Sequence, residues 1–284
     1  MTSSKQRVLV IGAHPDDCDI CAGGLAALMT EQGHAVKFVS MTNGDTGHQQ
    51  MGGGELARRR EREAQAAGRV LGIAYQVMDN HSGELDASVH HRKEVVRLIR
   101  RFKPDLVLTH PPDDYHPDHR YTSTLVQDSA YIVTVPGMCA LTPHLEKNPV
   151  YAYMGWSASK TQTLVPEVTF DIEAVMDKKL AMIRCHASQF LEWIPYNQGR
   201  LDEVPSDPAE QRRWLDEHFK ARFRALADHY RERLVAQFGP GRGREIQAAE
   251  GLAACPFGSP LTPETLQRLF GSLPGQAIGA MQQA

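Results

Sequence analysis

The first 109 residues alternate between short apolar runs and helical segments, and this alternation restricts the fold more than any other feature of the sequence. The apolar runs are rich in β-branched residues and end in glycine or polar residues, as do strands buried on both faces of a sheet. The predicted strands cover residues 7–13, 35–41, 75–78 and 105–109, and the predicted helices cover residues 19–32, 55–71 and 88–102. Strands and helices at this spacing form right-handed βαβ units. The sequence therefore predicts an α/β fold with a parallel sheet flanked by helices.

The pattern is weaker after about residue 150. Residues 150–154 and 168–172 are candidate strands, residues 173–186 predict a helix, and residues 205–238 predict a long charged helical region with room for one break. Residues 256–284 are rich in Gly, Pro and Gln, a composition typical of a loosely ordered tail. We therefore expect a single domain over residues 1–255 with a helical C-terminal extension, followed by a tail over residues 256–284.

Composition argues against several kinds of partner. The formal net charge of −3 gives no electrostatic reason for binding nucleic acid or an anionic membrane. No stretch reaches the roughly 18 apolar residues of a membrane span, and the N-terminus lacks the apolar segment of a signal peptide. The chain has five cysteines, an odd number, and is large enough to fold without disulfides, so reduced thiols and a cytoplasmic location are expected.

Two clusters of histidine and aspartate follow the first and the fourth predicted strands. His14, Asp16 and Asp17 follow the first, and residues 113–119 (Asp-Asp-Tyr-His-Pro-Asp-His) follow the fourth. In parallel sheets, ligands bind beyond the carboxyl ends of the strands. Either cluster alone is also compatible with a polar turn, an N-cap or a surface loop. Two distant clusters that the predicted fold brings to one sheet edge favour a binding site.

These side chains suit metal-dependent hydrolysis. A catalytic zinc typically takes three protein ligands and leaves one position for water. The residues that can supply such a set are His14, Asp17 and His119. Asp16 can act as a base on the water, because a bound metal lowers the pKa of that water to about 7. His116 can stabilise the charge that develops on a carbonyl oxygen, and Asp118 can hydrogen-bond the second nitrogen of an imidazole ligand.

The same residues lie in motifs that resemble those of the PIG-L/LmbE family of zinc-dependent N-deacetylases. Residues 13–17 (Ala-His-Pro-Asp-Asp), with Asp19 and Gly23-Gly24, resemble its first motif, and residues 114–120 (Asp-Tyr-His-Pro-Asp-His-Arg) resemble its second. Similar later elements are residues 60–64, 71–72, 188–190 and 249–251. The resemblance covers roughly residues 7–255. Asp19 is a departure, because the family usually has Glu there.

The resemblance implies a function and a role for each site residue. One zinc ion is implied, with His14, Asp17 and His119 as its ligands. Asp16 corresponds to the catalytic base, His116 to the residue that polarises the carbonyl, and Arg60 to an arginine of the substrate site. Family members have a Rossmann-like fold, remove acetyl groups from N-acylated amino sugars such as N-acetylglucosamine derivatives, and in several cases form trimers or hexamers. We therefore expect a small-molecule amino-sugar substrate and a homo-oligomer.

Alternative functions remain open at this point. A hydrolase of another bond, such as a phosphoester, would need two metals about 3.5–4 Å apart, whereas the sequence offers three ligands, which favours one metal. Cys18 and Cys21 form a Cys-x-x-Cys at a predicted helix start, a position typical of redox thiols, although packing in the core is the simpler role. Iron(II), cobalt or manganese could occupy the same ligand set as zinc.

Several further residues have a structural interpretation beside the functional one. Arg60 lies in a run with Arg58, Arg59 and Arg62, which a solvated helix face would also explain. The glycine-rich residues 44–54 lack the ending of a phosphate-binding P-loop and predict a substrate-side loop, with His48 near the pocket. The aromatic residues that could stack on a sugar, or pack in the core or at the rim, are Trp156, Trp193 and Tyr196.

Overall fold

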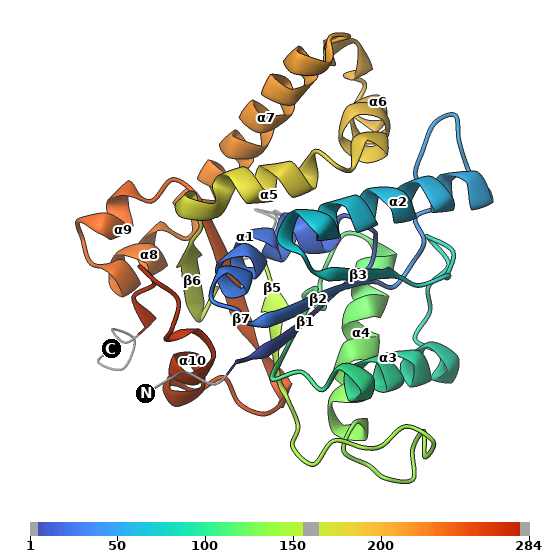
Figure 1. Ribbon diagram of the computed structural model, residues 1–284, viewed down its shortest axis with the longest axis vertical. Coiled ribbons are helices and arrows are strands. Elements are labelled where there is room, and N and C mark those ends of the chain that lie inside the picture. Colours follow the sequence, from blue (N-terminus) through green and yellow to red (C-terminus); the bar gives the residue numbers. More distant parts are fainter. Residues whose placement is uncertain (1–4, 156–164, 279–284) are drawn as a thin grey trace.

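A seven-stranded sheet forms the centre of the computed structural model, which describes residues 5–155 and 165–278 (Figure 1). Its strand order is β3-β2-β1-β4-β5-β7-β6. The strands are β1 (Arg7–Gly12), β2 (Ala35–Ser40), β3 (Ala74–Val77), β4 (Leu106–Thr109), β5 (Val150–Met154), β6 (Val168–Asp171) and β7 (Ala249–Gly258). The first five are parallel, and β7 runs antiparallel to both β5 and β6.

The predicted α/β class is confirmed, and so are the six predicted strands. The sheet is mixed rather than wholly parallel, because β7 lies between β5 and β6 in the opposite direction. The sequence of β7, AEGLAACPFG, contains no β-branched residue, so propensity gives little sign of a strand. Its hydrogen bonds to two neighbours make it a strand.

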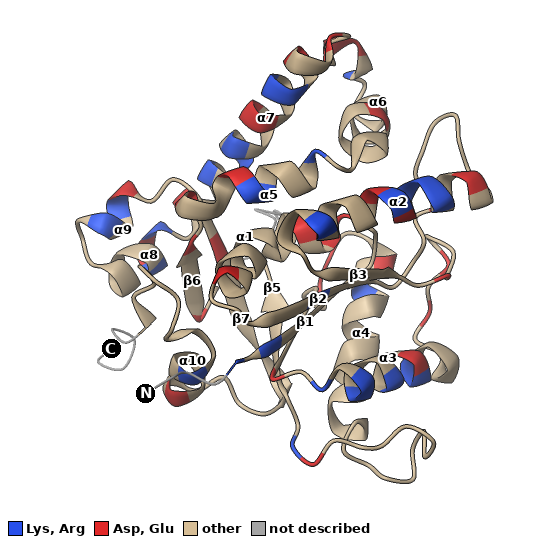
Figure 2. Ribbon diagram, viewed as in Figure 1, with Lys and Arg blue, Asp and Glu red and all other residues tan. Residues whose placement is uncertain are grey.

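Helices cover both faces of the sheet, which explains why the strands are almost continuously apolar. Val8 and Val10 of β1 pack in one buried cluster, whereas Leu9 and Ile11 point into the other. The first cluster lies under α1 (Asp17–Glu31), α2 (Gly53–Leu71) and α5 (Met176–Ile183), and the second under α3 (Val89–Phe102) and α4 (Pro117–Ile132) (Figure 1). Both signs of charge lie along α2 and α7 (Figure 2).

The predicted helical region at residues 205–238 is confirmed with one break, at Tyr230, between α7 (Pro208–His229) and α8 (Arg231–Phe238). The other helical segments of this part are a π-helical segment at Ser188–Trp193, the 3₁₀ turns Glu173–Val175 and Leu201–Glu203, α6 (Ile194–Asn197), α9 (Arg242–Glu245) and α10 (Pro263–Phe270). None of the helices in the described residues is long and apolar enough to cross a membrane.

Residues 256–278 form ordered structure where composition predicts a loosely ordered tail. β7 continues to Gly258, and Leu266, Leu269 and Phe270 of α10 are buried in the core on the same face as α1. Their spacing of three and one residues gives α10 an apolar face, a signal that the Gly, Pro and Gln content of the whole segment obscures. The division of the chain at residue 255 stays a prediction.

The order of the strands determines where a ligand can bind. From β1 the chain proceeds to β2 and β3 on one side, and β4 and β5 lie on the other. A crevice therefore opens between the carboxyl ends of β1 and β4, at the switch point of the sheet. The two predicted clusters of histidine and aspartate follow these two strands.

Candidate metal centre and active site

The turn after β1 folds Asp17 back onto the strand. Asp17 begins α1, and its Oδ2 accepts hydrogen bonds from the backbone N–H groups of Ala13, at 3.0 Å, and His14, at 2.7 Å. A side chain at Gly12 would lie 2.8 Å from the Cβ of Asp17, so the turn requires glycine there. These contacts fix the carboxylate beside the imidazole of His14.

The second cluster forms the first turn of α4. His116 is the N-cap, and its Nδ1 accepts the backbone N–H of Asp118 at 3.1 Å. Pro117 follows at the first helical position, where its fixed φ and missing N–H favour a helix start. Residues three apart in a helix lie on the same side, so His116 and His119 both reach the crevice. The N-cap bond leaves the proton of a neutral His116 ring on Nε2.

The structure brings the three predicted ligands together. Nδ1 of His14 lies 3.2 Å from Nε2 of His119 and 3.4 Å from Oδ2 of Asp17, and Nε2 of His119 lies 3.5 Å from Oδ1 of Asp17. Donors about 2.0–2.1 Å from a tetrahedral metal are separated from one another by roughly 3.3–3.4 Å. Each imidazole donor thus lies about as far from an Asp17 oxygen as two ligands of one divalent metal do, and the nearest oxygen is Oδ2 for His14 and Oδ1 for His119.

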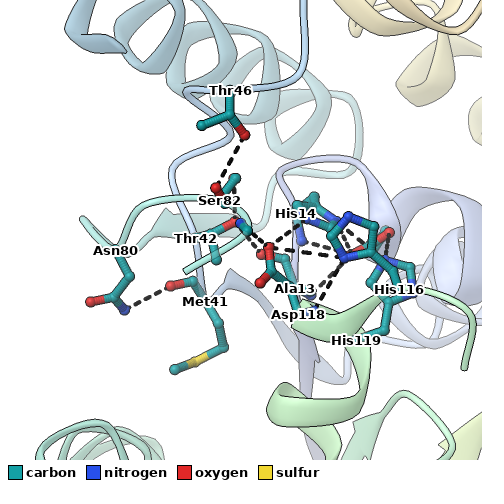
Figure 3. Close-up of polar contacts among 12 residues, drawn as sticks. Ala13, His14, Met41, Thr42, Thr46, Asn80, Ser82, His116, Asp118 and His119 are labelled. Atoms are coloured by element: carbon teal, nitrogen blue, oxygen red, sulfur yellow. Dashed lines mark hydrogen bonds and ion pairs between the residues drawn. The ribbon is translucent and has the colours of Figure 1, made fainter. Parts of the chain in front are cut away.

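Carboxylates lie behind both imidazoles, and the contact to His14 is a hydrogen bond, whereas that to His119 is an ion-pair contact. Nε2 of His14 lies 3.1 Å from Oδ2 of Asp118, and Nδ1 of His119 lies 3.1 Å from Oδ1 of Asp114. The backbone N–H of Gly83 also donates to Oδ2 of Asp118, at 2.6 Å. Figure 3 shows the imidazoles of His14, His116 and His119 gathered around Asp118. Such contacts fix the ring orientation and tautomer of metal-binding histidines.

The electrostatics of the cluster favour a cation. Burial opposes a charge on His14, but hydrogen bonds to Asp118 and Asp17 outweigh it and raise the pKa of His14 to about 9. Burial alone would raise the pKa of Asp17, yet the imidazoles of His119 and His110 hold it well below its ordinary value. Burial and the neighbouring imidazoles of His14 and His119 lower the pKa of His116 to about 4. Positive charge is therefore stabilised beside Asp17, while His116 stays neutral.

The predicted base, Asp16, lies at the pocket and is held by Arg60. Nη2 of Arg60 lies 3.1 Å from Oδ1 of Asp16, and both residues are buried. Arg58 and Arg62 are exposed, so the solvated-face interpretation holds for them and not for Arg60. A side chain at Gly44, where φ is +75°, would lie 2.6 Å from the Arg60 side chain. The ion pair shows Arg60 positioning Asp16, while its contact with substrate stays a prediction.

A cavity of about 260 Å³ opens beside these residues. Its other walls come from the glycine-rich loop, with Thr46 and Gly47, and from the segment around Gln189 and Trp193, with Arg222 of α7. The predicted substrate-side position of the glycine-rich loop agrees with this lining. Nε2 of His48, by contrast, lies 2.7 Å from Oε2 of Glu192 and does not line the cavity.

Sequence reasoning missed His110. It follows β4 directly, is fully buried, and stacks on His119 with ring centroids 4.0 Å apart. Its Nε2 accepts the backbone N–H of Ala13 and lies 3.2 Å from Oδ2 of Asp17. Two groups of three donors, all within 4.8 Å of one another, could hold a metal in the described residues: Asp17, His110 and His119, and His14, His116 and His119. The available signal was a histidine at the carboxyl end of a predicted strand.

The remaining candidates in the described residues lie in the core or at the pocket. Burial raises the pKa of the Cys18 and Cys21 thiols well above the ordinary value, which opposes redox reactivity. Asp19 pairs with His186, at 3.0 Å, and both are buried. Trp193 lines the pocket and stacks with Tyr196, whose ring is half exposed; Trp156 lies outside the described residues.

A Rossmann-like sheet with a histidine and carboxylate centre at its switch point defines the chain as a metal-dependent α/β enzyme. Residues 9–130 match the sequence model of the family described as PIG-L: GlcNAc-PI de-N-acetylase. The chain is 32% identical to diacetylchitobiose deacetylase from Thermococcus kodakarensis over 210 residues, which cover 67% of this chain and 74% of that protein. The chain belongs to the PIG-L family.

Two further comparisons show how the family varies. The N,N′-diacetylchitobiose deacetylase structure from Pyrococcus horikoshii matches with a TM-score of 0.67 and 26% identity, covering 89% of this chain and 85% of that one. 4-Oxalmesaconate hydratase from Pseudomonas putida is 29% identical over 209 residues, covering 71% of this chain and 81% of that protein. Proteins with this level of similarity to the chain are thus named for two different reactions, deacetylation and hydration.

Proposed function

We propose that this protein is a metal-dependent N-deacetylase that removes an N-acyl group, most often acetyl, from an amino-sugar substrate. The observation that carries the proposal is the close approach of His14, Asp17 and His119, whose donor atoms lie pairwise 3.2–3.5 Å apart, in the wall of a cavity that Asp16 and His116 also line. The family model and the deacetylase from Thermococcus kodakarensis support the choice of an N-acetyl amide.

The protein's own groups are arranged for amide hydrolysis. A divalent cation bound by the three ligands would supply Lewis acidity and lower the pKa of a bound water to about 7. Asp16, oriented by its ion pair with Arg60, accepts a proton from the attacking water. Nε2–H of His116 donates to the carbonyl oxygen as it becomes negative, because Nδ1 is occupied by the N–H of Asp118. The proton on Asp16 then passes to the departing amine.

We propose zinc as the metal, because two imidazoles and one carboxylate are the ligands of many catalytic zinc sites. Iron(II), cobalt or manganese would suit the same donors, so the purified protein should be analysed for all four. One ion per chain supports the proposal. Two ions per chain with hydrolysis of phosphoesters would favour the two-metal alternative.

The central test measures free amine released from N-acetylglucosamine derivatives and from diacetylchitobiose by the metal-loaded protein. Asp16→Asn should lower the rate by at least about 10²-fold, the effect typical of losing a general base. His119→Ala should lower the rate as strongly, because it removes a metal ligand. Asp113→Ala removes an exposed carboxylate of the same loop and is the matched control. If Asp16→Asn and His119→Ala both keep full activity, the assignment is wrong.

A second candidate is hydration of an unsaturated carboxylic acid. The observation that favours it is the 29% identity to the protein named 4-oxalmesaconate hydratase, which spans 81% of that protein. A direct comparison assays amine release and the loss of ultraviolet absorbance of an unsaturated tricarboxylate with the same protein sample. Activity on the tricarboxylate alone would replace the deacetylase proposal.

The cytoplasmic location and the homo-oligomer, a trimer or hexamer, remain proposals from family resemblance. Light scattering coupled to size-exclusion chromatography of the purified protein tests the oligomer. A mass near 31.6 kDa, the mass of one chain, would contradict it.

A further inference from the structure

The walls of the pocket differ in charge. Asp16 and Asp17 lie on the side of β1 and α1, with the metal ligands. The opposite part of the lining comes from the segment after α5 and from α7. Its members are Gln189, Trp193, Ile194 and Arg222. Arg222 is the charged residue of this wall among the described pocket-lining residues.

Arg222 lines the pocket from α7. It lies between the buried residues Phe219 and Phe223 along α7, half-buried, with its guanidinium 5.9 Å from the centroid of the Phe219 ring. Burial lowers its pKa to about 10, so the side chain stays charged at neutral pH. Arg224, two residues along the same helix, is exposed and lines none of the described cavities that Arg222 lines.

The guanidinium also lies at a junction. A second cavity, of about 50 Å³, shares Ile194 and Arg222 with the main pocket. Its lining is mainly apolar and aromatic, including Phe190, Trp214 and Phe219. A substrate whose acetamide lies at the metal centre can therefore extend along this wall, past Arg222, toward a second and less polar space.

We propose that Arg222 is a specificity-determining residue that selects substrates with an anionic substituent, a carboxylate or phosphate, on the amino sugar. This inference rests on the proposed deacetylase function. The planar guanidinium presents a fork of donors that matches a carboxylate or phosphate, and such charge-assisted bonds are about twice as strong as neutral ones.

The test compares two substrates that differ in charge at one position. N-acetylglucosamine 1-phosphate is the anionic probe, and methyl N-acetylglucosaminide is the neutral probe. Specificity is measured as the ratio of kcat/KM for the anionic probe to that for the neutral one. Arg222→Gln should lower this ratio by about 10- to 100-fold, the effect of losing hydrogen bonds to a charged group, and Arg222→Lys should lower it less. Arg224→Gln should leave the ratio unchanged.

A binding measurement makes the inference independent of turnover. Calorimetric titration of the metal-loaded Asp16→Asn protein with N-acetylglucosamine 1-phosphate should give a Kd that rises by the same factor when Arg222→Gln is added. Thermal denaturation shows whether each variant is folded. If Arg222→Gln changes both substrates equally, or changes neither the ratio nor the Kd, the role of Arg222 is refuted. If no N-acetyl substrate releases amine while the Kd still depends on Arg222, the proposed function fails and the anion site stands.

Discussion

Substitutions of Asp118 test the metal centre most directly, because both hydrogen bonds of its side chain are made by a single oxygen. Oδ2 receives both the N–H of Gly83, at 2.6 Å, and Nε2 of His14, at 3.1 Å, whereas Oδ1 is buried without a hydrogen-bond partner in the described residues. Asparagine can place its carbonyl oxygen at the Oδ2 position and keep both bonds. Alanine removes both.

The two substitutions should therefore differ in magnitude. Asp118→Asn loses only the charge assistance of the bond to His14, a difference of about 1 kcal/mol, which corresponds to roughly fivefold weaker metal binding. Asp118→Ala frees the imidazole to rotate and change tautomer, and loss of such a partner typically costs 10- to 100-fold in metal affinity. Asp118→Ala also leaves the N–H of Gly83 unsatisfied, at a cost of about 1–3 kcal/mol in unfolding free energy.

Competition with a chromophoric chelator for zinc or cobalt measures the affinity, and urea unfolding measures the stability. Asp113→Ala, which removes an exposed carboxylate of the same loop, controls for the change in net charge. Equal affinities for wild type and a folded Asp118→Ala protein would refute the reasoning that this carboxylate orients the His14 ligand.

Three further predictions concern stability and pH. The buried guanidinium of Arg100 donates hydrogen bonds to backbone carbonyls that follow α4, including those of Val133 and Thr142. Arg100→Met should therefore lower the unfolding free energy, measured in urea, by about 2–4 kcal/mol. A loss below about 0.5 kcal/mol would contradict this prediction. Lys179 and Glu250 form a buried ion pair, so Lys179→Met should lower the unfolding free energy by about 3–5 kcal/mol. Adding Glu250→Gln to that variant should recover part of the lost stability. Additive losses in the double variant would show that the two charges are not coupled. Burial lowers the pKa of His34 below its ordinary value of 6.5. Below pH 6.5 the unfolded chain therefore binds a proton at His34 more readily than the folded chain does. The unfolding free energy should fall as the pH drops through this range. The variant His34→Gln should lose stability less steeply than wild type between pH 8 and pH 5, and parallel curves would contradict this.

The sequence alone was sufficient for the elements whose signals are local. Short apolar runs such as that of β1 predict strands that are buried on both faces, and glycine or proline marks the ends of these runs. The parallel order of such strands places their carboxyl ends at one edge, so the convergence of His14 and His119 could be anticipated without coordinates. The sequence also predicted room for one break in the charged helical region, but no Gly or Pro marks its position at Tyr230.

Contacts between distant segments required the tertiary structure. The pairing of β7 with β5 and β6 cannot be predicted from the propensities of the local sequence. The same holds for the stacking of His110 on His119. Among four neighbouring arginines, only the packing of α2 against the sheet selects Arg60 to meet Asp16. The position of α7 brings Arg222 to the pocket in the same way.

The sequence by itself determined the class of fold, the edge of the sheet that carries the chemistry and the kinds of atoms gathered there. Only the tertiary structure decided which carboxylate orients which imidazole, which arginine is buried, and which residues form the far wall of the pocket. The physical reason is that backbone preference and apolar periodicity act over a few residues, whereas the burial and orientation of a polar side chain depend on partners that are often more than 100 residues away.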